Sequence, residues 1–197
     1  MTFVGEVSTS PQTEVMIATY PEKLEKFIEY LAPLTSRPSV DDLRDQMLKF
    51  HVSAVEIEGF VHFNKSGYRR NMVFENETVE LLCLCWKSGQ RSPIHNHASS
   101  IGGVKIVEGV GTETVFETTP SGYIKAVSSN DYERGLVMVS EDADTHQIAN
   151  LQSEGKDLVT LHIYSPPLRS MGTYSIDSRK TETYAPVNEG HIDESEI

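Results

Sequence analysis

Basic residues are scarce in this chain of 197 residues: 17 lysines and arginines stand against 29 aspartates and glutamates, for a formal net charge of −12 at pH 7. The sequence also has no long basic run. Nucleic acids and anionic membrane surfaces attract proteins mainly through clusters of positive charge. We therefore expect neither a nucleic acid nor a membrane among its partners.

Long apolar runs are lacking too. No stretch approaches the ~20 apolar residues of a membrane-spanning helix, and the first residues, MTFVGEVSTSPQTEV, show no charged segment followed by an apolar run. The composition, 38% hydrophobic and 23% charged, is that of a globular protein. We expect a single cytoplasmic domain with a sizeable core, as a monomer or weak oligomer.

Cysteine is limited to Cys83 and Cys85, in the segment ELLCLCW. On a strand both side chains face the same side, and neighbours two apart are poorly placed for a disulfide. A C-x-C pair without a second pair is also a weak zinc signal. We expect two small apolar core residues in a reducing compartment.

The first part of the chain has helical periodicity. In YPEKLEKFIEYLAPL, Pro21 lies near the first turn of a predicted amphipathic helix. Its apolar residues at positions i, i+3, i+4 and i+7 are Leu24, Phe27, Ile28 and Leu31. A second helix is predicted in PSVDDLRDQMLKF. There, Ser39 and Asp42 have the spacing of an N-terminal cap, and the predicted buried residues are Leu43, Met47 and Leu48.

From about residue 67 the pattern changes to short strands separated by turn residues. The runs are YRRNMVF, VELLCLCW, GGVKIVEG, GTETVFET, YIKAVSS, GLVMVS, THQIANL and DLVTLHIYS. Many close strands without helices between them predict a mainly β fold, an antiparallel sandwich or barrel. We divide the domain into a helical segment (1–66) packed on the barrel, the barrel (67–178), and an acidic, loosely attached tail (179–197).

Two histidines stand one residue apart in SPIHNH, at His95 and His97. On a strand, side chains at i and i+2 face the same side, so both imidazoles can bind one metal ion. An isolated H-x-H is weak evidence. It is strengthened by His146, which opens a later strand and is followed by Asn150 four residues on.

This pattern resembles the two motifs of the cupin superfamily over about residues 89–150. Many cupins have a glutamate ligand a few residues after H-x-H, but residues 98–102 here read ASSIG. Glu108 lies too far along the strand and is expected to be exposed. Three neutral imidazoles leave a divalent ion its full charge and open positions, which favours an anionic substrate ligand such as a thiolate on Fe(II). Zinc hydrolysis with three histidines and a water remains an alternative.

Residues beyond the histidines resemble the cysteine dioxygenase family, over roughly residues 20–180. The matching pieces, in order, are YRRN (68–71), LCW (84–86), SPIHNH (92–97), His146 before Asn150, and LHIYSPP (161–167). The resemblance implies that His95, His97 and His146 are Fe(II) ligands. It implies a cupin barrel preceded by helices.

The same resemblance implies the substrate contacts. Arg70 matches the arginine that binds the substrate carboxylate, although Arg69 is one residue of register away. A guanidinium suits a carboxylate because it can donate two parallel hydrogen bonds. Tyr68 matches a pocket tyrosine that assists, Trp86 is expected in the pocket wall, and Met171 stands near the pocket where animal members have a cysteine.

Tyr164 matches the active-site tyrosine of the family, and His162 and Thr160 match the pair that hydrogen-bonds it. Ser165-Pro166 falls at a cis-peptide position. Gly102 stands where animal members have the cysteine that is cross-linked to the tyrosine, so this chain resembles the bacterial members, which have no cross-link.

The resemblance implies an enzyme of cysteine catabolism that adds both atoms of O2 to L-cysteine and forms cysteine sulfinic acid. Some relatives have Gln at the Arg70 position and prefer 3-mercaptopropionate, so YRRN favours cysteine. Two alternatives stay open. One is a dioxygenase for another small thiol, 3-mercaptopropionate or cysteamine, although cysteamine has no carboxylate for Arg70. The other is a non-catalytic cupin that binds a metal or small ligand.

Overall fold

A computed structural model describes residues 20–141 and 145–189 of the chain. Its helices are α1 (Glu22–Leu31), α2 (Val40–Lys49) and the 3-10 helix η1 (Val55–Phe60). Its strands are β1 (Arg69–Glu75), β2 (Glu80–Trp86), β3 (Ile94–His95), β4 (Ile101–Glu108), β5 (Val110–Thr118), β6 (Ile124–Glu133), β7 (Val137–Ser140), β8 (Thr145–Ala149), β9 (Leu158–Ser165), β10 (Met171–Tyr174) and β11 (Glu182–Tyr184). Within the described residues, no helix is long and apolar enough to cross a membrane.

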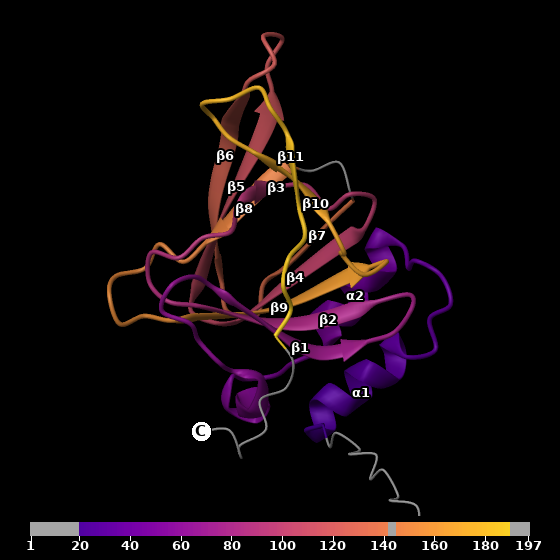
Figure 1. The fold of residues 1–197 in the computed structure, drawn as a ribbon. Coiled ribbons are helices and arrows are strands. Elements are labelled where there is room, and N and C mark those ends of the chain that lie inside the picture. Colours follow the sequence, from indigo (N-terminus) through magenta and orange to yellow (C-terminus); the bar gives the residue numbers. More distant parts are fainter. Residues whose placement is uncertain (1–19, 142–144, 190–197) are drawn as a thin grey trace, which may run out of the picture.

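The strands form two sheets. One has the order β1-β2-β9-β4-β7 and the other β11-β10-β3-β8-β5-β6, and the strand pairs within each sheet are antiparallel. Figure 1 shows the helices α1 and α2 beside the five-stranded sheet. The mainly β fold with preceding helices is therefore confirmed. Each of the eight predicted strand segments overlaps an observed strand, and β3, β10 and β11 are additional.

Alternation along β2 separates two cores. Cys83 and Cys85 belong to the outer core, which includes the buried residues of the helices, whereas Leu84 and Trp86 belong to the inner core between the sheets. Both cysteines are fully buried and free, as predicted, with their Sγ atoms 3.9 Å apart. Hydrogen bonding between the two thiols, together with burial, raises the pKa of Cys83 well above its usual value.

The second helix is capped as its sequence predicts, because Ser39 Oγ accepts a hydrogen bond from the Asp42 backbone N–H at 3.1 Å. Leu43 and Met47 are buried, but Leu48 is 45% exposed, so the prediction that Leu48 is buried is wrong. Residues four apart lie on the same stripe of a helix, and the next residue is rotated by about 100° away from it.

Helix α2 packs closely on β4 at Gly103. A Cβ atom at Gly103 would lie 2.6 Å from Met47 Sδ, so a larger residue here requires the Met47 side chain to move. Two residues on, the buried Lys105 donates a hydrogen bond to the Met47 carbonyl at 2.9 Å. This carbonyl lies in the last turn of α2, where carbonyl groups have no partner within the helix.

The segment after residue 178 differs from the loosely attached tail that its composition predicts. Strand β11 pairs with β10, and Asn71 and Glu189 form a parallel bridge at the edge of β1. The Glu189 backbone N–H donates to the Arg70 carbonyl at 2.8 Å, and Met72 N–H donates to the Glu189 carbonyl at 2.9 Å. The edge strand β1 offers free backbone groups, and these residues satisfy them. Residues 190–197 lie outside the described part of the chain.

The two leucines of α2 provide a test of the packing. We expect Leu43→Ala to lower the free energy of unfolding by about 2–5 kcal/mol, because it leaves a cavity in the outer core. The matched variant Leu48→Ala removes an exposed side chain, and its effect should stay within about 0.5 kcal/mol. Urea unfolding followed by circular dichroism measures both. Equal losses would contradict the assignment of the buried face.

Candidate metal centre and pocket

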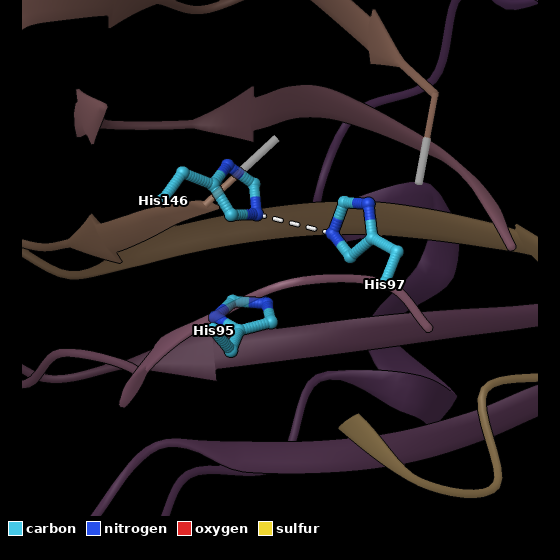
Figure 2. A group of neighbouring side chains, drawn as sticks. All are labelled: His95, His97 and His146. Atoms are coloured by element: carbon cyan, nitrogen blue, oxygen red, sulfur yellow. Dashed lines mark hydrogen bonds between the residues drawn. The ribbon is translucent and has the colours of Figure 1, made fainter. Parts of the chain in front are cut away.

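Three buried histidines meet where the two sheets face each other. Strand β3 pairs with β8 so that His95 and His146 are directly opposite, and His97 follows two residues after His95. One ligand atom from each histidine lies within 4.8 Å of those of the other two. Figure 2 shows the three rings grouped together, with His146 and His97 in direct contact. The structure thus brings together the three residues that the sequence predicts as ligands.

His97 is not on a strand but begins a tight turn. Ala98 and Ser99 both have positive φ angles, 45° and 81°. This backbone region is costly for residues other than glycine, so the turn needs support. It receives a hydrogen bond from Arg37 Nη1 to the Ser99 carbonyl at 2.9 Å. The turn carries the His97 ring back toward the other two imidazoles.

Hydrogen bonds at Nδ1 orient two of the rings. His95 Nδ1 lies 2.9 Å from the Pro93 carbonyl, and His146 Nδ1 lies 2.8 Å from Glu113 Oε1 on β5. Both partners accept, so we assign the proton to Nδ1 in each ring, which leaves Nε2 with a free lone pair. A carboxylate behind a ligating histidine is common in metal sites. The sequence does not single out Glu113, because it is adjacent to His146 only through the β5–β8 pairing.

The histidines fit a divalent metal ion. His146 Nε2 and His97 Nε2 are 3.1 Å apart, which is close to the separation of about 3 Å expected for two nitrogens each about 2.1 Å from one ion at a right angle. Among the described residues, His97 Nδ1 is buried without a hydrogen-bond partner. Burial lowers the pKa of His95 to about 3 and the pKa of His97 well below its usual value. Neutral imidazoles are the form that binds metals.

A chain of hydrogen bonds runs along the inner face of β9 to Tyr164. Trp86 Nε1 donates to Thr160 Oγ1 at 3.0 Å, and Thr160 Oγ1 lies 2.9 Å from His162 Nε2. On the other side of the ring, His162 Nδ1 lies 3.0 Å from the Tyr164 hydroxyl. The resemblance groups Thr160 and His162 with Tyr164, but Thr160 reaches the tyrosine only through His162, and the contact of Trp86 with Thr160 was not expected. The Ser165-Pro166 bond that follows is cis, as predicted.

The proton positions in this chain decide what Tyr164 can do. The alternative acceptor for the Thr160 hydroxyl, the Leu84 carbonyl, is 3.4 Å away, so we assign the hydroxyl proton to the shorter bond with His162 Nε2. His162 then donates from Nδ1 to the Tyr164 oxygen, and the Tyr164 hydroxyl proton stays free. Burial raises the pKa of Tyr164 to about 12, so the phenol is protonated at neutral pH.

Of the two neighbouring arginines, Arg70 faces the histidines. It is 5% exposed, and its Cζ lies 5.7 Å from the centre of the Tyr164 ring. Its Nη2 is buried without a hydrogen bond among the described residues. The Arg69 side chain is 17% exposed, and its Nη2 lies 3.5 Å from a carboxylate oxygen of Glu189. Adjacent residues on a strand face opposite sides, so Arg69 points away from the histidines, and Glu189 of the C-terminal segment partly covers it.

The cavity at the histidines is small, about 10 Å³, enough for roughly one water molecule. Its walls are Tyr68, Arg70, Leu84, Trp86, Ser92, His95, His146, Ile148, His162 and Tyr164. The rings of Tyr68 and Trp86 stack at 4.3 Å in this wall. Tyr68 and Arg70 also line an outer hollow of about 370 Å³. Met171 is buried in the inner core but is not in the cavity wall.

Gly102 lies against the His97 ring. A Cβ atom at this position would be 2.5 Å from His97 Cε1, so a side chain here requires His97 to move. Gly102 carries no thiol, and Cys83 and Cys85 lie in the outer core, whereas Tyr164 lies in the inner core. Glu108 is exposed, as expected.

Comparison with solved structures shows which fold the chain has. The fold is similar to an uncharacterized conserved protein with a double-stranded β-helix domain from Klebsiella pneumoniae, with a TM-score of 0.50 and 12% identity, over 60% of this chain and 88% of that chain. The likeness shows the fold, a double-stranded β-helix of two antiparallel sheets, in which this chain has three inward histidines.

Sequence comparison then defines the family. The model of the family described as Cysteine dioxygenase type I matches residues 12–177. The chain is 31% identical over 170 residues to cysteine dioxygenase type 1 of Danio rerio, with 83% of each chain covered. It is 28% identical over 162 residues to the Homo sapiens protein of the same name, with 79% of each covered. The chain belongs to the cysteine dioxygenase type I family.

The carboxylate behind His146 should strengthen metal binding. We expect Glu113→Gln to lower the affinity for Fe(II) about 10- to 100-fold, because the neutral amide lacks the negative charge that orients and polarises the imidazole. Competition with a coloured chelator measures the affinity. Glu117→Gln, an exposed change on the same strand, is the matched control and should bind iron like the unchanged protein. An affinity equal in both variants would remove Glu113 from the site.

The depressed pKa of His95 predicts acid lability of the metal-free protein. The unfolded chain takes up a proton on His95 near the usual pKa of 6.5, whereas the folded chain does so only near 3. Between these values the unfolded state binds more protons, so stability falls as the pH is lowered below 6.5. This histidine contributes up to about 1.4 kcal/mol per pH unit.

Urea unfolding in the presence of a chelator, at several pH values between 6.5 and 4, measures this slope. In His95→Gln the free energy of unfolding should fall less steeply with decreasing pH. The slope should correspond to about one proton fewer taken up on unfolding. Identical slopes for the two proteins would show that His95 is not protected from protonation by burial.

Proposed function

We propose that this protein is a cysteine dioxygenase, which converts L-cysteine and O2 to cysteine sulfinic acid at an Fe(II) ion held by His95, His97 and His146. Membership of its family implies a dioxygenase. The observation that carries the choice of substrate is Arg70 in the wall of the cavity that two of the three histidines line. Its buried Nη2 makes no hydrogen bond, and the Glu80 Oε1 atom with which it forms an ion pair is 3.7 Å away.

The donor set supports iron and a thiol. Three neutral imidazoles with no carboxylate ligand leave a divalent ion its full positive charge, which an anionic thiolate from the substrate compensates. When bound, Fe(II) supplies the redox chemistry that allows O2 to react with the sulfur of the substrate. The overall change, RSH + O2 → RSO2H, puts both oxygen atoms on sulfur and needs no further reductant.

Arg70 binds the substrate carboxylate in this proposal. Its guanidinium is the cation in the cavity wall, and the wall contains no carboxylate among its described residues. A bound carboxylate gives the buried Nη2 the hydrogen bond that Glu80, at 3.7 Å, does not provide. Cysteamine has no carboxylate and leaves this group unpaired. 3-Mercaptopropionate has one, so it is the second candidate substrate on the same observation.

Tyr164 supplies a proton donor beside the reacting sulfur. Its oxygen is held by His162 Nδ1 at 3.0 Å, and its ring packs against His97 with the ring centres 5.3 Å apart. With the proton assignment above, the hydroxyl proton points away from His162 and is available to the thiolate, to O2 or to the carboxylate. The stacked rings of Tyr68 and Trp86 form an aromatic part of the cavity wall.

We propose a reducing, cytoplasmic location for the protein. The chain has two cysteines, both buried thiols, and so lacks the several spaced cysteines of a disulfide framework typical of oxidising compartments.

Oxygen uptake by the iron-loaded protein tests the proposal, with L-cysteine, 3-mercaptopropionate and cysteamine offered separately and sulfinate assayed. We expect one O2 consumed per cysteine sulfinate formed, and the highest kcat/KM for L-cysteine. A higher kcat/KM for 3-mercaptopropionate would support the dioxygenase activity but show that L-cysteine is not the preferred substrate. Absence of uptake with every thiol, despite bound iron, would favour a non-catalytic binding protein.

The two arginines separate the substrate contact from general charge effects. We expect Arg70→Ala to raise KM for L-cysteine about 10- to 100-fold, because it removes a charge-assisted hydrogen bond. Arg69→Ala changes the same residue type one position earlier and should raise it less than threefold. The reverse order of effects would mean that Arg69 binds the carboxylate.

A further inference from the structure

Arg70 is held by two residues from distant parts of the chain. Its Nε donates to Asn188 Oδ1 at 2.8 Å, and Asn188 Nδ2 donates to Glu80 Oε2 at 3.0 Å. The other oxygen of Glu80, Oε1, lies 3.7 Å from Arg70 Nη2. The amide of Asn188 is thus hydrogen-bonded to both the cation and the carboxylate.

Glu80 is itself held in place by burial and by a backbone hydrogen bond. Its side chain is fully buried at the start of β2, and its Oε1 accepts a hydrogen bond from the Leu168 backbone N–H at 2.9 Å. Burial raises the pKa of Glu80, and Leu168 N–H, Arg70 and Asn188 act in the opposite direction by stabilising the carboxylate. Its two oxygens therefore both have partners.

Asn188 is brought to Arg70 by backbone pairing. Strand β11 adds to the edge of one sheet beside β10, and Glu189 bridges to β1 at the edge of the other. The C-terminal segment from Glu182 to Glu189 therefore joins the two sheet edges, as its yellow trace shows in Figure 1. Tyr184, Val187 and Glu189 from this segment line the outer hollow.

The contact selects which edge of the guanidinium is free. A guanidinium can bind a carboxylate through Nε and one Nη or through its two Nη atoms. Asn188 occupies Nε, and Nη2 has no hydrogen bond. With Nε occupied, a substrate carboxylate can be bound by two hydrogen bonds only through the two Nη atoms.

We propose that Asn188 is a positioning residue for the substrate: it fixes the Arg70 guanidinium so that its Nη edge faces the pocket and receives the carboxylate of a small thiol acid. The inference rests on the proposed function. A primary amide suits this position because it accepts from Nε and donates to Glu80 at once. Without it, Glu80 competes for the guanidinium and turns the Nη edge away from the pocket.

Kinetics and binding of L-cysteine to the iron-loaded full chain test this role. We expect Asn188→Ala to raise KM for L-cysteine about 10-fold, the loss of one hydrogen bond to a charged group, with kcat within twofold. Calorimetry under nitrogen should show the same 10-fold weakening for L-cysteine, and no more than a twofold change for cysteamine, which lacks the carboxylate.

Two further variants separate positioning from structural support. Asn188→Asp keeps the shape and the acceptor but removes the donor and adds a second anion beside Arg70, so it should weaken L-cysteine binding at least as much as Asn188→Ala. A residue that only fills space would tolerate this change. Thr183→Ala, a change in the same segment away from Arg70, is the control for docking of the segment and should leave KM within twofold.

The outcomes separate this inference from the proposed function. If the unchanged protein oxidises L-cysteine but Asn188→Ala and Asn188→Asp keep its KM and Kd within twofold, the positioning role is wrong and the dioxygenase stands. If no thiol is oxidised but L-cysteine binding still depends on Asn188, the positioning role stands and the dioxygenase fails.

Discussion

Burial of β9 on both faces is the constraint on which the rest of the structure depends. This strand pairs with β2 on one side and β4 on the other, and every residue from Leu158 to Ser165 is buried. Its outward residues pack in the core beneath the helices, and its inward residues carry the hydrogen bonds that reach Tyr164. Buried polar groups are tolerated only when they are paired. The chain from Trp86 to Tyr164 is therefore needed both for stability and for placing a phenol beside the histidines.

The charges of the pocket are few and arranged in layers. Three buried imidazoles form the inner layer, and the Glu113 carboxylate is hydrogen-bonded to one of them. At the outer end, Arg70 is balanced by Glu80, with Asn188 between them. In the proposed enzyme, a divalent ion on the imidazoles would provide the positive charge for a thiolate, and Arg70 would donate hydrogen bonds to a carboxylate. A small molecule with both groups matches the two ends.

Local patterns in the sequence predict much of this fold and its site. Strand segments with turn residues between them predict eight of the strands, and the H-x-H motif with His146 predicts the metal ligands. These features depend on neighbours in the chain, or on a family pattern that fixes their order. The prediction that Leu48 is buried is wrong. Sequence alone does not distinguish an apolar residue at the edge of a helical stripe from one within it.

The parts that could not be predicted depend on contacts between distant segments. Glu113 meets His146 through strand pairing, and Asn188 meets Arg70 across 118 positions of sequence. An acidic, polar terminal segment normally indicates weak attachment, and nothing in its composition shows that two of its backbone groups pair with β1. Residue-by-residue resemblance to a family also ends before this segment, near residue 180.

The bridge between Glu189 and β1 has a consequence for the association of the folded protein with itself. A strand at the edge of a sheet presents unpaired N–H and C=O groups that can recruit a strand from another molecule. Here the chain's own C-terminal segment occupies that edge at Arg70 and Met72. The segment that carries Asn188 thus also occupies, through the Glu189 backbone, groups of β1 that could pair with a strand of another molecule. Loosening this segment would expose the sheet edge to aggregation at the same time as it freed the guanidinium.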